Sequence, residues 1–262
     1  MKIRAIQRAQ YMGSEEFDWE EIRIGLKDPK LYLSGAIQFC QDILLYGFST
    51  FLPSIIVSMG YTVIEAQYLS IPVYIFGGLC FFSFAYLSDR YLMRGIPLWL
   101  SNVPGIIGYV LIICAPSDPV KFFGTFLCAI AVYNGPGLNL TWLNVNVAPH
   151  YRRATAIGMQ LSIGNSAGIV AGQIYTTAPY RFGNIFSVVT LGVSQIIIAV
   201  KWYYIRYCNE QKEKILAGEI EDTRSVKTGD RAPDFKYHLI QLLCLCSSDY
   251  KTIQLIMFCE SQ

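Results

Sequence analysis

Six long stretches of the chain are almost free of charged side chains, and short charged segments separate them. The stretches cover residues 31–57, 66–86, 96–114, 122–147, 154–175 and 184–205. Within them the only charged residues are Asp42 and, near the end of the last stretch, Lys201. A helix needs about 20 apolar residues to cross the roughly 30 Å hydrocarbon core of a bilayer. The pattern therefore predicts an all-α, polytopic membrane protein with six transmembrane helices.

The charges that flank these stretches predict their orientation. Cytoplasmic loops of membrane proteins carry an excess of Lys and Arg. One set of ends carries Lys27, Lys30, Arg90, Arg94, Arg152, Arg153, Lys201 and Arg206, and the other carries Lys121 and Arg181. We therefore expect both termini in the cytosol, with a cytosolic linker at 1–30, the membrane domain at 31–205 and a cytosolic tail at 206–262. The amphipathic segment 17–26 is expected to be a solvated or interfacial linker, and a helix is expected to continue beyond residue 207.

Composition agrees with a membrane protein and excludes other classes. Only 15% of the residues are charged, against about a quarter in soluble domains. A net charge of +2 does not favour a nucleic-acid-binding protein. The eight cysteines lack the paired spacing of a zinc site or a disulfide framework, so we expect neither metal nor cofactor. The two histidines lie outside the predicted crossings and no Gly-x-Ser-x-Gly motif is present, so we do not expect an enzyme.

Asp42 is the first candidate for a functional residue. A carboxylate within a membrane helix is costly, so it should face the bundle interior or a water-filled cavity. At helical spacing Gln38, Asp42, Tyr46 and Ser49 share one face. A polar stripe of this kind suits a path for a solute or a proton. The alternative is a structural hydrogen-bond network between helices.

Two further segments supply candidate solute contacts. In 133–146 (YNGPGLNLTWLNVN), Gly135-Pro136-Gly137 is expected to break the helix, because proline removes a backbone donor. If the helix breaks there, Asn134, Asn139 and Trp142 are candidate solute contacts. The alternative is a packing kink with hydrogen bonds between helices. In 154–175, Gly164, Gly168 and Gly172 recur every fourth position and predict close helix packing, with Gln160 and Asn165 beside them as solute contacts.

The charged loop at 84–95 (FAYLSDRYLMRG) carries a resemblance to a known family. Its pattern Ala85-x-x-x-Asp89-Arg90-x-x-x-Arg94-Gly95 resembles the loop signature G-x-x-x-D-[RK]-x-x-x-[RK] of the major facilitator superfamily. Residues 144–175 look like the tenth-to-eleventh helix region of its allantoate permease (anion:cation symporter) branch, and 28–56 resemble the seventh helix. Residues 229–237 (GDRAPDFKY) are similar to the cytosolic ending of that branch. The resemblance covers about 17–237, and the last 25 residues do not share it.

The resemblance implies a fold and a function. The fold would be the C-terminal six-helix half of a twelve-helix transporter, an inverted 3+3 repeat with the solute site at the midplane. The function would be secondary, proton-coupled transport of a small organic anion, such as allantoate, a nicotinate-like carboxylate or a vitamin, in the plasma membrane. The partners would be the bilayer, the anion, the proton, and either a second copy or a complementary N-terminal half. The alternative is a non-transporting membrane fragment or regulatory partner.

The resemblance also implies roles for charged residues. Asp89, Arg90, Arg94 and Arg153 would act in conformational gating, with Asp89 holding a helix end of the other half. Asp89 is therefore expected to have no partner within this chain. No Lys or Arg lies in the middle of a predicted crossing, so a cation that binds the anion is also expected outside the chain.

Overall fold

The computed structural model describes residues 19–91, 93–175, 180–220, 229–233 and 235–237. Within these ranges every regular secondary-structure element is a helix, as the sequence predicts. The elements are α2 (Trp19–Leu26), α3 (Pro29–Val57), α4 (Val63–Arg90), α5 (Gly95–Cys114), α6 (Asp118–Val145), α7 (His150–Asn165), α8 (Ala167–Ile174), α9 (Arg181–Leu216) and the short 3₁₀ helix η1 (Gly229–Arg231).

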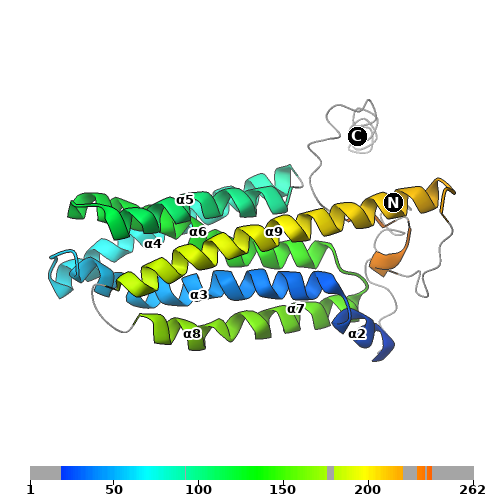
Figure 1. Cartoon of the computed structure of the whole chain (residues 1–262), viewed down its shortest axis with the longest axis horizontal. Coiled ribbons are helices and arrows are strands. Elements are labelled where there is room, and N and C mark those ends of the chain that lie inside the picture. The colour runs from blue at the N-terminus through cyan, green and yellow to red at the C-terminus, as the bar shows by residue number, and fades with distance from the viewer. Residues whose placement is uncertain (1–18, 92, 176–179, 221–228, 234, 238–262) are drawn as a thin grey trace, which may run out of the picture.

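The long helices lie side by side in a bundle with α3 at its centre (Figure 1). Helix α3 contacts α4, α6, α7, α8 and α9, while α5 packs against α6 and α9. The core between them contains Leu44, Phe48, Tyr109 and Val132, all fully buried. Helices α3, α5 and α7 begin at the same end of the bundle at which α9 finishes, on the right of Figure 1. We call this the basic end, because Lys30, Arg94, Arg152 and Lys212 lie there.

Four helices, α3, α4, α5 and α9, are long and apolar enough to cross a membrane. The crossing expected at 122–147 corresponds to α6, and the one expected at 154–175 is divided at Ser166 into α7 and α8. That these two stretches also cross the membrane, which would make six crossings, therefore stays a prediction. Helix α9 runs on to Leu216, so the helix expected to continue beyond residue 207 is confirmed.

The predicted break at Gly135-Pro136-Gly137 is wrong, because α6 is continuous from Asp118 to Val145. The glycines have a packing role instead. A Cβ atom on Gly135 would lie 2.1 Å from Oε1 of Gln41, and one on Gly137 would lie 2.5 Å from Cε2 of Phe81. Glycine at these positions lets the side chains of α3 and α4 approach the backbone of α6 closely.

Buried ion pairs hold the elements at the basic end together. Nζ of Lys30 lies 2.5 Å from Oδ2 of Asp230, and Arg152 pairs with Oδ1 of the same carboxylate. Lys30, Arg152 and Asp230 are 3%, 0% and 0% exposed. Arg152 also lies 2.7 Å from Oε2 of Glu21 in α2. The segment 17–26 was expected to be a solvated or interfacial linker. Its described part, residues 19–26, forms α2 and docks on α7, and residues 17 and 18 lie outside the described residues.

Residues 229–233 and 235–237 bind the end of α9 as well. Nζ of Lys212 donates hydrogen bonds to the carbonyl oxygens of Asp230 (2.6 Å) and Phe235 (2.7 Å). Asn209 exchanges two 3.0 Å hydrogen bonds with the backbone of Tyr237. Gly229 enters this segment at φ 62°, where a Cβ atom would meet the carbonyl oxygen of Ala148 at 2.5 Å. The similarity noted for GDRAPDFKY thus marks a segment that joins α3, α7 and α9.

Replacing Asp230 with Asn should destabilise the protein severely. The change leaves Lys30 and Arg152 buried with less compensating charge, and breaking a buried pair in this way costs roughly 3–5 kcal/mol. Thermal or denaturant unfolding in detergent micelles measures the loss. The matched control is Glu213→Gln, which removes an exposed 3.0 Å pair with Lys236 and should cost about 0–1 kcal/mol. Equal effects of the two replacements would contradict this account of the basic end.

The same carboxylate should make stability depend on pH. Burial alone raises the pKa of Asp230. The positive charges of Lys30 and Arg152, and the hydrogen bonds they donate, lower it by more, so the pKa of Asp230 lies below its ordinary value. A folded-state pKa below the unfolded one, about 3.9, means that the contribution is complete above that pH and is lost as pH falls through the folded-state pKa. Unfolding between pH 3 and 7 should therefore show a stability loss on acidification that is smaller in Asp230→Asn.

Candidate solute and proton site

A buried carboxyl and amide pair forms the centre of the candidate site on α3. Gln38 and Asp42 are 3% and 4% exposed and lie one helical turn apart. Nε2 of Gln38 donates hydrogen bonds to both carboxylate oxygens of Asp42, at 3.0 and 3.2 Å. The carboxylate thus accepts hydrogen bonds from the Gln38 amide inside the bundle.

Two neighbouring helices add amide groups to this pair. Nδ2 of Asn139 in α6 donates to Oε1 of Gln38 at 3.0 Å and to the carbonyl oxygen of Ser34 at 2.9 Å. Nε2 of Gln160 in α7 donates to the same Oε1 at 3.0 Å. Polar groups in hydrocarbon must be satisfied by protein partners, so these contacts tie α3, α6 and α7 together.

Lys201 extends the network to α9. Its side chain is fully buried, with Nζ 3.4 Å from Oδ1 of Asn139 and 3.8 Å from the ring centroid of Trp142. The sequence pattern placed Lys201 among the flanking positive charges, and that interpretation is wrong. Because α9 continues for 15 residues beyond it, Lys201 lies inside the helix and faces the bundle. Its value as a candidate could have been recognised from its position within an apolar stretch.

A second polar group lies on the same face of α3, farther from the basic end. The hydroxyl of Tyr46 donates to Oδ1 of Asn165 at 2.6 Å, and Asn165 is exposed. The hydroxyls of Ser49 and Tyr133 are 3.4 Å apart. These groups can be reached from outside the described bundle, whereas Gln38 and Asp42 are enclosed. The face therefore offers an accessible polar part and a buried acidic part.

The structure brings together most of the predicted contact residues. Gln38, Asp42, Asn139 and Gln160 share one network, Tyr46 and Asn165 pair beside it, and Trp142 contacts Lys201. Asn134 does not join them, because its Nδ2 donates to the carbonyl oxygen of Ile130 in its own helix at 2.7 Å. A residue that was not predicted, Gln41, donates to Asn102 (3.1 Å) and Ser194 (3.0 Å) and so links α3 to α5 and α9.

The three glycines of the predicted packing stripe differ in their surroundings. A Cβ atom on Gly164 would lie 2.3 Å from Oδ2 of Asp42 and 2.5 Å from Cγ of Gln38. One on Gly168 would contact Tyr46 at 3.6 Å, and one on Gly172 would meet nothing within 4 Å. The backbone of α7 therefore lies close to Asp42 and Gln38 at Gly164. Helix packing at Gly168 and Gly172 stays a prediction.

The predicted gating residues lie at the basic end, away from this network. Arg94 pairs with Asp89 and donates to Oγ of Ser88 at 3.1 Å. The expectation that Asp89 has no partner in this chain is therefore wrong, since the loop brings the two charges together. The Asp89 side chain is 68% exposed, so the pair is worth about 0–1 kcal/mol. Arg153 donates to the carbonyl oxygen of Val147 at 2.9 Å, and Arg90 to the hydroxyl of Tyr86 at 3.4 Å.

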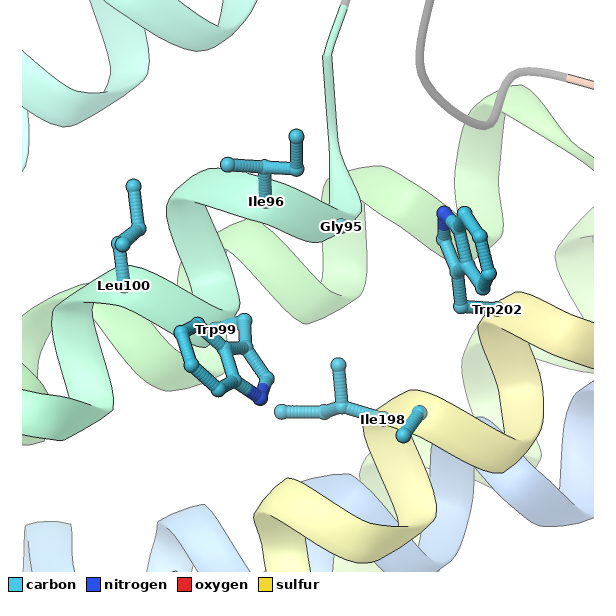
Figure 2. Close-up of a pocket in the computed structure, with 7 residues that line it drawn as sticks. Gly95, Ile96, Trp99, Leu100, Ile198 and Trp202 are labelled. Carbon is cyan, nitrogen blue, oxygen red and sulfur yellow. The ribbon is translucent and has the colours of Figure 1, made fainter.

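A groove between α5 and α9 is unsuited to an ionic solute. It has a volume of about 390 Å³ and is lined by Gly95, Ile96, Trp99, Leu100, Ile198, Ala199 and Trp202. Figure 2 shows Trp99 projecting from α5 and Trp202 from α9 around it. Its lining offers apolar surface and no ionised group, so the network on α3 is the better candidate site.

Comparison with known proteins identifies transporters as relatives. No family model matches the chain. The chain is 44% identical over 240 residues, 91% of its length and 50% of the relative, to an uncharacterized transporter of Schizosaccharomyces pombe. It is 29% identical over 230 residues to the high-affinity nicotinic acid transporter of Saccharomyces cerevisiae, covering 85% of the chain and 43% of the relative. An MFS-type transporter of Penicillium expansum is 26% identical over 238 residues, covering 85% and 46%.

The chain spans about half the length of these curated relatives. Their names and the four long apolar helices indicate an integral membrane protein related to transporters.

Replacing Gly164 with Ala should destabilise the bundle, whereas Gly172→Ala should not. Both changes raise helix propensity, by up to about 1 kcal/mol. At Gly164 the added methyl group would overlap Asp42 and Gln38, and overpacking typically costs about 1–3 kcal/mol. At Gly172 it would enter open space. Unfolding of both variants in the same detergent measures the difference, and an equal or greater stability of Gly164→Ala would contradict the described contact between α7 and α3.

Proposed function

We propose that this chain forms part of a secondary transporter of the major facilitator superfamily that moves a small organic anion together with a proton. The observation that carries the proposal is the enclosed Gln38–Asp42–Asn139–Gln160 network at the centre of a bundle of apolar helices. The similarity to proteins named as transporters supports it. Six crossings, the inverted repeat and the allantoate permease branch belong to the proposal as the sequence resemblance implies them.

Asp42 is the proposed proton carrier. Intramembrane carboxyl groups mark proton relays in transporters, and this one is buried beside an accessible polar surface. Tyr46 and Asn165 are the proposed solute contacts, because they lie next to Asp42 and can be reached from outside. The relative named as a nicotinic acid transporter supports an aromatic or other small carboxylate as the solute. Lys201 is enclosed, so the cation that binds the anion is proposed to come from outside this network.

The proposed orientation places the basic end in the cytosol of a plasma-membrane protein. The concentration of Lys and Arg at that end supports it. The ion pair of Asp89 and Arg94 would then lie on the cytosolic side, where it can bias inward-open against outward-open forms. A pair worth about 0–1 kcal/mol would change such populations by up to about fivefold.

A second candidate is a membrane component that transports only with a second six-helix body. The chain spans about half of its relatives, and α4 leaves a broad apolar face uncovered. Ile75, Leu79 and Phe82 on this face are 59%, 62% and 72% exposed. Such a face suits either lipid or a further helical half, supplied by a longer chain, a second copy or a complementary polypeptide.

Replacing Asp42 with Asn should uncouple transport from the proton gradient. Proteoliposomes would contain the chain alone, or the chain with the part of the Schizosaccharomyces pombe relative that it does not cover. We expect nicotinate uptake driven by an inward proton gradient to fall at least about tenfold in Asp42→Asn, as for loss of an essential proton carrier. Exchange of nicotinate without a gradient should persist. The control Asp118→Asn, in a partly exposed 2.8 Å pair with Lys121, should leave both activities unchanged.

The possible outcomes separate the candidates. Uptake only in the combined sample would favour the second candidate. Absence of solute movement in both samples, for protein shown to be folded by its unfolding transition, would favour a non-transporting membrane fragment and overturn the transport proposal. Proton-driven uptake that survives in Asp42→Asn would remove Asp42 from the mechanism.

A further inference from the structure

We propose that Lys201 is the counter-charge of Asp42, and that Asn139 and Gln38 connect the two charges into one unit that spans α3, α6 and α9. The role of this unit in transport rests on the proposed function, whereas its existence can be tested on the folded protein alone. We call Asn139 and Gln38 the bridge. In transport, a change in the charge of Asp42 would alter the contacts of α6 and α9 through this bridge.

The first argument is that both groups are buried and lack an ion pair. Asp42 is 4% and Lys201 0% exposed, and neither forms an ion pair with another described residue. Lys30, the cation nearest to this region along α3, already pairs with Asp28 and Asp230. A single buried charge is unfavourable in a bilayer, and one anion with one cation restores neutrality.

The second argument is the direction of the hydrogen bonds. Lys201 donates to the oxygen of Asn139 (3.4 Å), Asn139 donates to the oxygen of Gln38 (3.0 Å), and Gln38 donates to Asp42 (3.0 Å). Every donor therefore points from the cation toward the anion, and each amide dipole is aligned with the field between them. Hydrogen bonds in such a chain polarise and strengthen one another, especially at low dielectric.

The third argument is that the groups surrounding the bridge do not supply another uncompensated charge. Lys30 is close enough to act electrostatically on Lys201, but it is already paired with Asp28 and Asp230. From α7 it receives the amide of Gln160 and the backbone at Gly164, and from α6 the ring of Trp142 lies against Lys201. A proton on Asp42 would remove the negative end, leave Lys201 uncompensated and remove the reason for the alignment. Because the links belong to different helices, a charge change at Asp42 alters the contacts of α3 with α6 and of α6 with α9.

A double-mutant cycle tests the pair. Asp42→Asn, Lys201→Met and the double variant would be purified in lipid nanodiscs and their thermal midpoints measured at one fixed pH. Each single variant should lower the midpoint by about 5 °C or more, because it leaves one buried charge uncompensated. The double variant should be more stable than at least one of the single variants. The exposed pair Arg206 and Glu210, 3.0 Å apart, provides a control cycle whose coupling should be much smaller, because exposed ion pairs contribute little.

Two further variants test the bridge itself. In an Asn139→Leu background the coupling between positions 42 and 201 should shrink at least by half, whereas Lys201→Arg should retain coupling with the natural Asp42. If the Asn139 variant does not fold, fluorotryptophan labelling gives an independent measurement. The ¹⁹F resonance of Trp142, assigned by its loss in Trp142→Phe, should shift in Asp42→Asn, while that of Trp19 should not.

An additive cycle together with an unshifted Trp142 resonance would overturn the inference. That result leaves the transport proposal standing if Asp42→Asn still abolishes proton-driven uptake. Conversely, strong coupling in a protein that moves no solute would support the charge pair and overturn the proposed function.

Discussion

The absence of water around membrane-embedded polar groups is the constraint on which this structure depends. A polar side chain in hydrocarbon needs a protein partner, and α3 carries more of them than its own backbone can satisfy. Its side chains therefore form hydrogen bonds with several neighbouring helices. Gln38 bonds to α6 and α7, Gln41 to α5 and α9, and Tyr46 to α7. The central position of α3 follows from these contacts as much as from apolar packing (Figure 1). Some of the same side chains form the candidate site. The polar residues that hold α3 in the bundle are therefore also the ones proposed to act in transport.

The bundle handles buried charge in two different ways. At the basic end, Asp230 touches Lys30 and Arg152 directly, and short contacts of this kind give strong attraction but hold the groups in one geometry. Around Asp42, two amides stand between the opposite charges. An amide can rotate and exchange donor for acceptor, which an ion pair cannot do. A direct ion pair suits a contact that keeps one geometry. A charge pair linked through amides suits a site at which a proton binds and is released.

The sequence predicted the helices well because each lies in a long uncharged stretch, and five of the six stretches became single helices. It also placed Gln38 and Asp42 on one face, because helical periodicity determines which residues of one helix are neighbours. The join at Ser166 and the continuity of α6 through Pro136 were not predicted, since they depend on what the neighbouring helices supply. Contacts between helices, such as Lys201 with Asn139, depend on packing that periodicity does not encode. The Asp89–Arg94 pair was missed for a different reason, because the family resemblance directed attention to a partner elsewhere.

The location of Lys201 changes how an anion carrier built on this chain should be understood. A cation fully enclosed by α6 and α9 cannot meet a solute, so it serves the protein's own carboxylate rather than the transported one. Asp42 then sits in a neutral unit when ionised and in a positively charged unit when protonated. The arrival of a proton therefore places net positive charge beside Tyr46 and Asn165, where the solute is proposed to bind. An organic anion would be attracted most strongly at that moment, and this ordering is what coupled movement of a proton and an anion in one direction requires.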